Sequence, residues 1–218
     1  MAKQTTVFVC SECGATSPRW LGRCPSCGKF NTMAEEIVAP PAPAAAKAAK
    51  KSAYASSRAK PLSQVEFQTY ERTPSGISEF DNVIGGGIVK GSLILLGGDP
   101  GIGKSTLLTQ IAAHLSQSHK VLYFSAEESC SQVKLRAGRL NVPSDNLLLL
   151  NETCIDGLES ELDGVEFCVI DSIQAVYTED LSSSSGSVGQ VRECASRIMR
   201  IAKSRGITFF IIGHVTKE

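Results

Sequence analysis

Two cysteine pairs near the start of the chain have the spacing of a metal site. Cys10 and Cys13 form one Cys-x2-Cys pair, Cys24 and Cys27 form the second, and a glycine follows each pair directly. Four converging thiolates are typical ligands of a structural Zn²⁺ and leave no coordination position open for water. A redox-active dithiol is the competing interpretation, but two paired motifs are far more specific for zinc than one.

A second motif matches the phosphate-binding pattern G-x4-G-K-S/T, directly after an apolar run and before a predicted helix. Its glycines let the backbone wrap around phosphates, so that N–H groups at the start of the helix point at the anion. Lys104 is expected to reach the β- and γ-phosphates of ATP, and Ser105 to bind Mg²⁺. The motif comprises Gly98, Asp99, Pro100, Gly101, Ile102, Gly103, Lys104, Ser105 and Thr106.

Hydrolysis of a nucleotide also needs carboxylates near the phosphates. Asp171 ends the apolar run FCVID and is expected to complete the magnesium shell. Glu127 and Glu128 follow the run VLYFSA, and Glu127 is the predicted activator of water, with Glu128 capping the next helix as the alternative. His214 follows the run ITFFIIG and is expected either to sense the γ-phosphate or to be a solvated loop histidine.

The elements that would position these residues alternate between apolar strands and helices. Near-continuous apolar strands are buried on both faces, which predicts an α/β fold with a mostly parallel sheet flanked by helices. The carboxyl ends of such strands share one edge of the sheet, so the residues named above should meet there. The predicted strands are Leu93 to Gly98, Val121 to Ala126, Leu147 to Leu150, Phe167 to Asp171 and Ile207 to Gly213, and the main helices are Lys104 to Ser118 and Ser187 to Ser204.

Composition divides the 218 residues into three parts. The zinc module is expected at 7–32, a basic Ala/Pro-rich linker at 33–64 and the nucleotide-binding core at 65–218. The linker holds five positive charges, which either keep a mobile tether in solution or contact a phosphate backbone. Equal numbers of basic and acidic residues, 22 of each, predict no strong attraction of the whole molecule to nucleic acid. No signal peptide or membrane span is predicted, so we expect a cytoplasmic protein without membrane contact.

Taken together, these motifs resemble the bacterial RadA (Sms) family of RecA-like DNA repair ATPases. The resemblance covers nearly the whole chain and rests on the four-cysteine head followed by GGDPGIGKST, FSAEES, VIDSIQ, GSVGQVRE and IIGHVTKE. It implies a RecA-like P-loop NTPase core behind the zinc module, with Lys104, Ser105 and Asp171 as Walker residues and Glu127 as the catalytic glutamate.

The resemblance also implies a function. Members of this family are DNA-dependent ATPases that process recombination intermediates by branch migration, with single-stranded and branched DNA and RecA as partners, in a hexameric ring. The polar stretch from Tyr177 to Gly189 falls where such proteins carry a flexible DNA-facing loop. Gln190 and Arg192 are the nearest candidates for DNA contacts, with a solvated helix face as the alternative.

The resemblance departs from the family at the end of the chain. The family continues past GHVTKE through the rest of the core, a KNRFG motif and a Lon-protease-like domain, whereas this chain ends at Glu218. A truncated chain is therefore expected to bind ATP and zinc but to hydrolyse ATP poorly. One alternative is a nucleotide-controlled DNA- or protein-binding module without productive hydrolysis. Another is a P-loop kinase for a small metabolite, which a water-activating glutamate disfavours.

Overall fold

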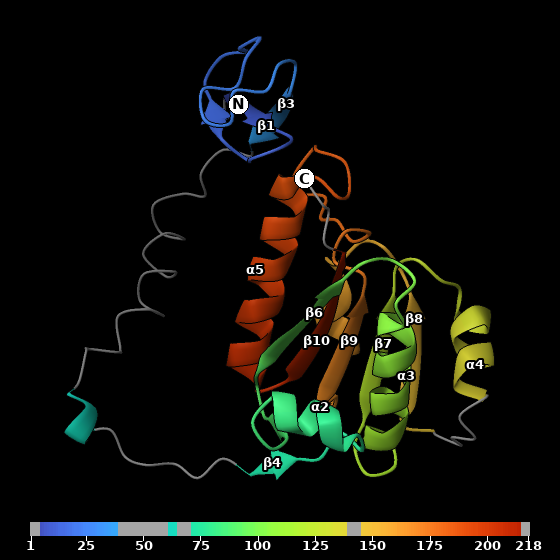
Figure 1. The fold of residues 1–218 in the computed structure, drawn as a ribbon. Coiled ribbons are helices and arrows are strands. Elements are labelled where there is room, and N and C mark those ends of the chain that lie inside the picture. Colours follow the sequence, from blue (N-terminus) through green and yellow to red (C-terminus); the bar gives the residue numbers. More distant parts are fainter. Residues whose placement is uncertain (1–4, 39–60, 65–70, 139–144, 215–218) are drawn as a thin grey trace.

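The computed structural model describes residues 5–38, 61–64, 71–138 and 145–214. They form a three-stranded sheet near the N-terminus, a two-stranded sheet and a five-stranded sheet (Figure 1). Residues 39–60 of the predicted linker lie outside the described residues, so its two interpretations stay open. Within the described ranges, no helix has both the length and the apolar character needed to cross a membrane.

The N-terminal module is a small antiparallel sheet. Its central strand β1 (Thr5–Cys10) pairs with the short β2 (Thr16–Ser17) on one side and with β3 (Met33–Val38) on the other. Every residue of β3 has a partner in β1, although the sequence assigned this segment to the linker. Its Ala-Glu-Glu run lacks the alternating apolar residues that would predict a strand. The segment is a strand because its backbone forms hydrogen bonds with β1.

The central sheet has the strand order β6-β10-β9-β7-β8, and all neighbouring strands are parallel. This arrangement confirms the predicted α/β fold, and each strand agrees with its predicted range to within one residue at either end. The strands are β6 (Leu93–Gly98), β7 (Val121–Ser125), β8 (Leu147–Asn151), β9 (Phe167–Asp171) and β10 (Thr208–His214).

The register of these strands sets up one functional edge. His214 lies opposite Gly98 across β10 and β6, and Ser125 lies opposite Asp171 across β7 and β9. Ile211 of β10 lies opposite Ile170 of β9, so β6 and β10 extend two residues beyond β9 and β7. All four carboxyl ends still lie at the same edge of the sheet. A shift of one residue in any pairing would turn that strand's side chains to the other face.

Helices cover both faces of the sheet (Figure 1). On one face α3 (Lys104–Leu115) packs against Tyr123, and on the other α5 (Val188–Arg205) packs against Phe124. Tyr123 and Phe124 are neighbours in β7 and therefore pack into the cores on opposite faces of the sheet, because side chains alternate between the two faces along a strand. The remaining elements are the helices α2 (Ser78–Val83) and α4 (Cys130–Gly138), the 3-10 turns η1 (Leu62–Gln64) and η2 (Leu158–Glu161), and the antiparallel pair of β4 (Arg72–Thr73) and β5 (Ile88–Val89).

Gln190 organises the loop before α5 rather than facing outward. Its side chain is fully buried, and its amide nitrogen lies within hydrogen-bond distance of the backbone oxygens of Thr178, Leu181 and Ser183 at 3.0–3.1 Å. Its amide oxygen accepts a hydrogen bond from the Thr178 N–H at 2.9 Å. The prediction that Gln190 contacts DNA is therefore wrong, because each polar atom of its amide already has partners inside the protein.

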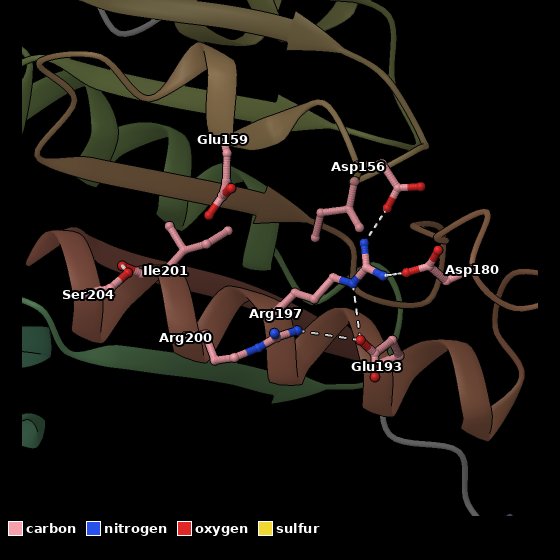
Figure 2. Close-up of a pocket in the computed structure, with 9 residues that line it drawn as sticks. Asp156, Glu159, Asp180, Glu193, Arg197, Arg200, Ile201 and Ser204 are labelled. Carbon is pink, nitrogen blue, oxygen red and sulfur yellow. Dashed lines mark hydrogen bonds and ion pairs between the residues drawn. The ribbon is translucent and has the colours of Figure 1, made fainter. Parts of the chain in front are cut away.

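A second set of interactions fixes the same loop to α5. The Arg197 guanidinium is surrounded by carboxylates from three segments, Asp156, Asp180 and Glu193 (Figure 2). Asp156 also accepts a hydrogen bond from the Thr178 hydroxyl at 2.7 Å. Burial raises the pKa of Asp156, but this hydrogen bond and Arg197 outweigh it and lower the pKa. The loop is thus held by a buried amide and by an ionic cluster.

Replacing Gln190 by leucine should unfold this loop locally. The change keeps the volume but leaves a buried N–H and several carbonyls without partners, which costs about 1–3 kcal/mol. We expect lower stability in urea and faster chymotrypsin cleavage at Tyr177 or Leu181. Gln117→Leu, at an exposed position just after α3, is the matched control and should behave like the unmodified protein. Equal cleavage rates for both variants would contradict this role of Gln190.

Candidate functional site

The four paired cysteines converge in one cluster. Their sulfur atoms all lie within 4.8 Å of one another, with Cys10 to Cys27 at 3.7 Å and Cys13 to Cys24 at 3.6 Å. A tetrahedron with zinc–sulfur bonds of 2.3 Å has edges of about 3.8 Å, so the cluster fits a four-thiolate zinc site. A redox dithiol needs only one Cys-x2-Cys pair, so the convergence of both pairs on one centre favours zinc.

The turns that carry these cysteines depend on glycine. Gly14 donates its N–H to the Cys10 carbonyl at 2.8 Å, and Gly28 does the same to Cys24 at 2.9 Å. Both glycines have positive φ angles, 69° and 75°, a conformation that side chains with a Cβ rarely adopt. The glycine after each cysteine pair therefore closes a tight knuckle that brings the two sulfurs together.

The cluster is electrostatically prepared for a cation. Burial raises the pKa of Cys10, but hydrogen bonds from Thr32 and from nearby backbone groups outweigh it and lower the pKa to about 6. A backbone hydrogen bond from Lys29 lowers the pKa of Cys27, but burial and the neighbouring sulfurs outweigh it and raise the pKa to about 12. Deprotonation of Cys27 is therefore unfavourable until a divalent cation compensates the negative charge of the other thiolates.

The phosphate-binding motif has the shape that its sequence predicts. It leaves β6 at Gly98 and enters α3 at Lys104, with Gly101 and Gly103 at φ angles of 80° and 94°. No side-chain hydrogen bond caps the start of α3, so its first N–H groups are available to an anion. Lys104 is only 7% exposed, and its ammonium donates hydrogen bonds to the carbonyls of Gly98 and Asp99 at 2.9 and 2.8 Å. This cradle fits the phosphates of a nucleotide.

Asp171 lies at the carboxyl end of β9, between the strands that carry the other candidates. It is 3% exposed, and its Oδ2 atom accepts a hydrogen bond from the Tyr123 hydroxyl at 2.7 Å. A buried carboxylate beside a phosphate cradle has the oxygen chemistry that Mg²⁺ prefers. This environment is compatible with the predicted magnesium role of Asp171, which with that of Ser105 stays a prediction.

The two adjacent glutamates after β7 have different environments. Glu127 accepts a hydrogen bond from the Ser172 hydroxyl, and its Oε1 atom lies 3.4 Å from His214 Nε2. Glu128 instead forms an ion pair with Arg136 of α4 at 2.6 Å. Glu128 therefore contacts α4 through this ion pair, whereas the sequence suggested that it caps the helix. This arrangement favours Glu127 for the catalytic role, which stays a prediction.

His214 lies at the same edge, at the end of β10. Its Nδ1 atom is buried and has no hydrogen-bond partner among the described residues, which distinguishes it from a solvated loop histidine. Sequence reasoning missed Ser172 and Tyr123, which donate hydrogen bonds to Glu127 and Asp171, respectively. It also missed Arg136, which contacts Glu128 and Tyr123. A tyrosine inside an otherwise apolar buried strand was the one available signal, because a buried hydroxyl needs a partner.

Removing one cysteine ligand should unfold the N-terminal module and leave the core intact. The module is too small to fold on its hydrophobic core alone, whereas zinc contributes roughly 10 kcal/mol or more. Arg19 and Arg23 lie in this module, so trypsin cleavage after them reports on its unfolding. We expect Cys24→Ser to lose bound zinc and to be cleaved faster at these sites, with Cys130→Ser of α4 as the control that keeps zinc and the slower cleavage. Equal cleavage rates in zinc-free Cys24→Ser and the unmodified chain would refute the structural role of the metal.

Comparisons with known proteins agree with both parts of the structure. A family model described as an AAA domain matches residues 58–218, and one described as a rubredoxin metal-binding domain matches residues 8–35. A solved structure of a KaiC-like protein from Pyrococcus horikoshii aligns with a TM-score of 0.56 at 20% identity, over 69% of this chain and 73% of that one. At this identity the likeness supports the fold alone.

Curated relatives match from end to end of the chain. The DNA repair protein RadA of Bacillus subtilis is 49% identical over 222 residues and that of Listeria monocytogenes is 48% identical over 226 residues. Each alignment covers all of this chain and 48% of the relative, so the chain spans about half the length of these relatives. The chain therefore belongs to the AAA domain family, and its resemblance to the RadA family of DNA repair ATPases, with a zinc module before a RecA-like core, is confirmed.

Proposed function

We propose that this chain carries the nucleotide site of a DNA-dependent ATPase of recombinational DNA repair. In this proposal ATP hydrolysis drives branch migration and the processing of recombination intermediates together with RecA. The observation that carries the proposal is the convergence of Lys104, Asp171, Glu127 and His214 at the carboxyl ends of four parallel strands. This edge is where ligands bind in open α/β folds.

Each residue of the site has a defined task in this proposal. When ATP binds, the Lys104 ammonium leaves the carbonyls of Gly98 and Asp99 and contacts β- and γ-phosphate oxygens. The N–H groups at the start of α3 hold the remaining phosphate oxygens. Ser105 and Asp171 hold Mg²⁺, which when bound neutralises the charge that develops on the phosphates. Glu127 orients the attacking water and accepts its proton. The Nε2 atom of His214 contacts the Oε1 atom of Glu127, and through this contact His214 senses the γ-phosphate.

The proposal for DNA rests on the loop before α5 and on the relatives. The loop is held by Gln190 and Arg197, so it presents a defined surface, and Arg192 lies exposed at the start of α5. Single-stranded and branched DNA are the proposed ligands because the relatives are named DNA repair proteins. The complete protein is proposed to form a hexameric ring in the cytoplasm.

The direct test is ATP hydrolysis by this chain with and without single-stranded DNA. We expect this chain, which spans about half the length of its relatives, to hydrolyse ATP slowly and DNA to stimulate that slow hydrolysis. Lys104→Ala should lower it by about 100-fold or more, because the ammonium stabilises charge on the transferred phosphoryl group. Binding of ATP without turnover, with or without DNA, would instead support the nucleotide-controlled binding module. A phosphorylated metabolite as the product would support the kinase interpretation.

The two glutamates provide a sharper test of the chemistry. Glu127→Gln keeps the side-chain volume and removes the base, so turnover should fall by about 10² to 10⁴-fold while ATP binding persists. Glu128→Gln weakens only an ion pair to Arg136 and should retain at least tenfold more turnover than Glu127→Gln. A larger loss of turnover in Glu128→Gln would reverse the assignment.

A further inference from the structure

Tyr123 is a buried tyrosine whose hydroxyl is aimed at the proposed magnesium carboxylate. It lies within β7, is 0% exposed and donates a hydrogen bond to Asp171 Oδ2 at 2.7 Å. A tyrosine hydroxyl ordinarily ionises only near pH 10, so it is a donor at physiological pH. A phenylalanine would fill the same core volume, so packing alone does not account for the hydroxyl.

Arg136 of α4 continues this hydrogen-bonded chain. Its Nη2 donates to the Tyr123 hydroxyl oxygen at 3.3 Å, and its Nε donates to the Thr109 hydroxyl at 2.9 Å. The Thr109 hydroxyl in turn donates to the backbone carbonyl of Ser105 at 2.7 Å. The chain of hydrogen bonds therefore begins at Asp171 and ends at Ser105, the two residues proposed to hold magnesium.

The charge on Arg136 strengthens this arrangement. Its side chain is 17% exposed, and its Nη1 forms the ion pair with Glu128. That ion pair fixes the guanidinium in one orientation, so that its other nitrogens point at Tyr123 and Thr109. A cation that donates to a hydroxyl polarises it, and the hydroxyl becomes a better donor to Asp171.

We infer that Tyr123 and Arg136 are positioning residues of the magnesium site, which orient Asp171 and hold it at a fixed distance from Ser105. The inference rests on the proposed nucleotide function and extends it to two residues that contact neither the nucleotide nor the metal. Tyr123 occupies one carboxylate oxygen of Asp171 and leaves the other for the metal. Arg136 ties that carboxylate to α3 through Thr109, so α4 becomes part of the support of the site.

The test is the Mg²⁺ dependence of ATP binding, measured by calorimetry in the unmodified chain and in Tyr123→Phe. Loss of a group that orients a metal ligand typically lowers metal affinity by about 10 to 100-fold. We therefore expect the Mg²⁺ concentration at half-saturation to rise at least tenfold, while ATP affinity in EDTA stays the same. Tyr177→Phe removes a hydroxyl that forms no hydrogen bond within the described structure and should change neither quantity.

Arg136→Lys provides the second variant, since lysine keeps the charge but has a single nitrogen in place of the three that contact Thr109, Tyr123 and Glu128. It should shift the Mg²⁺ half-saturation in the same direction by a smaller factor, and the exposed Lys134→Gln on the same helix should not. Equal Mg²⁺ dependence in Tyr123→Phe and the unmodified chain would overturn the inference alone. Equal losses of ATP affinity with and without Mg²⁺ would also overturn it, because they indicate general distortion. Failure of the unmodified chain to bind ATP at all would overturn the proposed function and the inference with it.

Discussion

The parallel register of β6, β10, β9 and β7 is the constraint on which the rest of this structure depends. It pairs His214 with Gly98 and Asp171 with Ser125, the first pair two residues further along the strands, so the phosphate cradle, the buried carboxylate and the glutamate after β7 meet at one edge. Apolar side chains on both faces fix that register, because a slip of one residue would exchange the core facing α3 with the core facing α5. Chemistry at the edge is therefore positioned by packing in the interior.

Much of this edge could be predicted from the sequence because its signals are local. An apolar run predicts a doubly buried strand, glycines before a lysine predict an anion cradle, and two Cys-x2-Cys pairs predict converging sulfurs. Gln190 and Arg136 could not be predicted, because periodicity reports which side chains are buried and not which distant group a polar side chain meets. Gln190 shares the buried face of α5 with Cys194 and Ile198, and its amide binds backbone atoms of a loop that precedes the helix, which spacing alone does not indicate.

The N-terminal module and the core are stabilised by different means. The core buries two layers of apolar side chains around the sheet, whereas the buried apolar cluster described in the module consists of Cys10, Cys24 and Met33, two of them proposed metal ligands. The module therefore depends on its metal, and the core depends on packing. Within the core, the hydrogen bonds that run from Tyr123 through Arg136 and Thr109 to Ser105 give this chain of polar groups partners near the site.

The most direct test of this account is an experimental structure of the chain with Mg²⁺ and a non-hydrolysable ATP analogue. The account predicts phosphates at the start of α3 in contact with Lys104, a magnesium ion between Ser105 and Asp171, and Glu127 facing the γ-phosphate beside His214. Phosphates bound away from α3, or a magnesium ion without Asp171 in its surroundings, would contradict it.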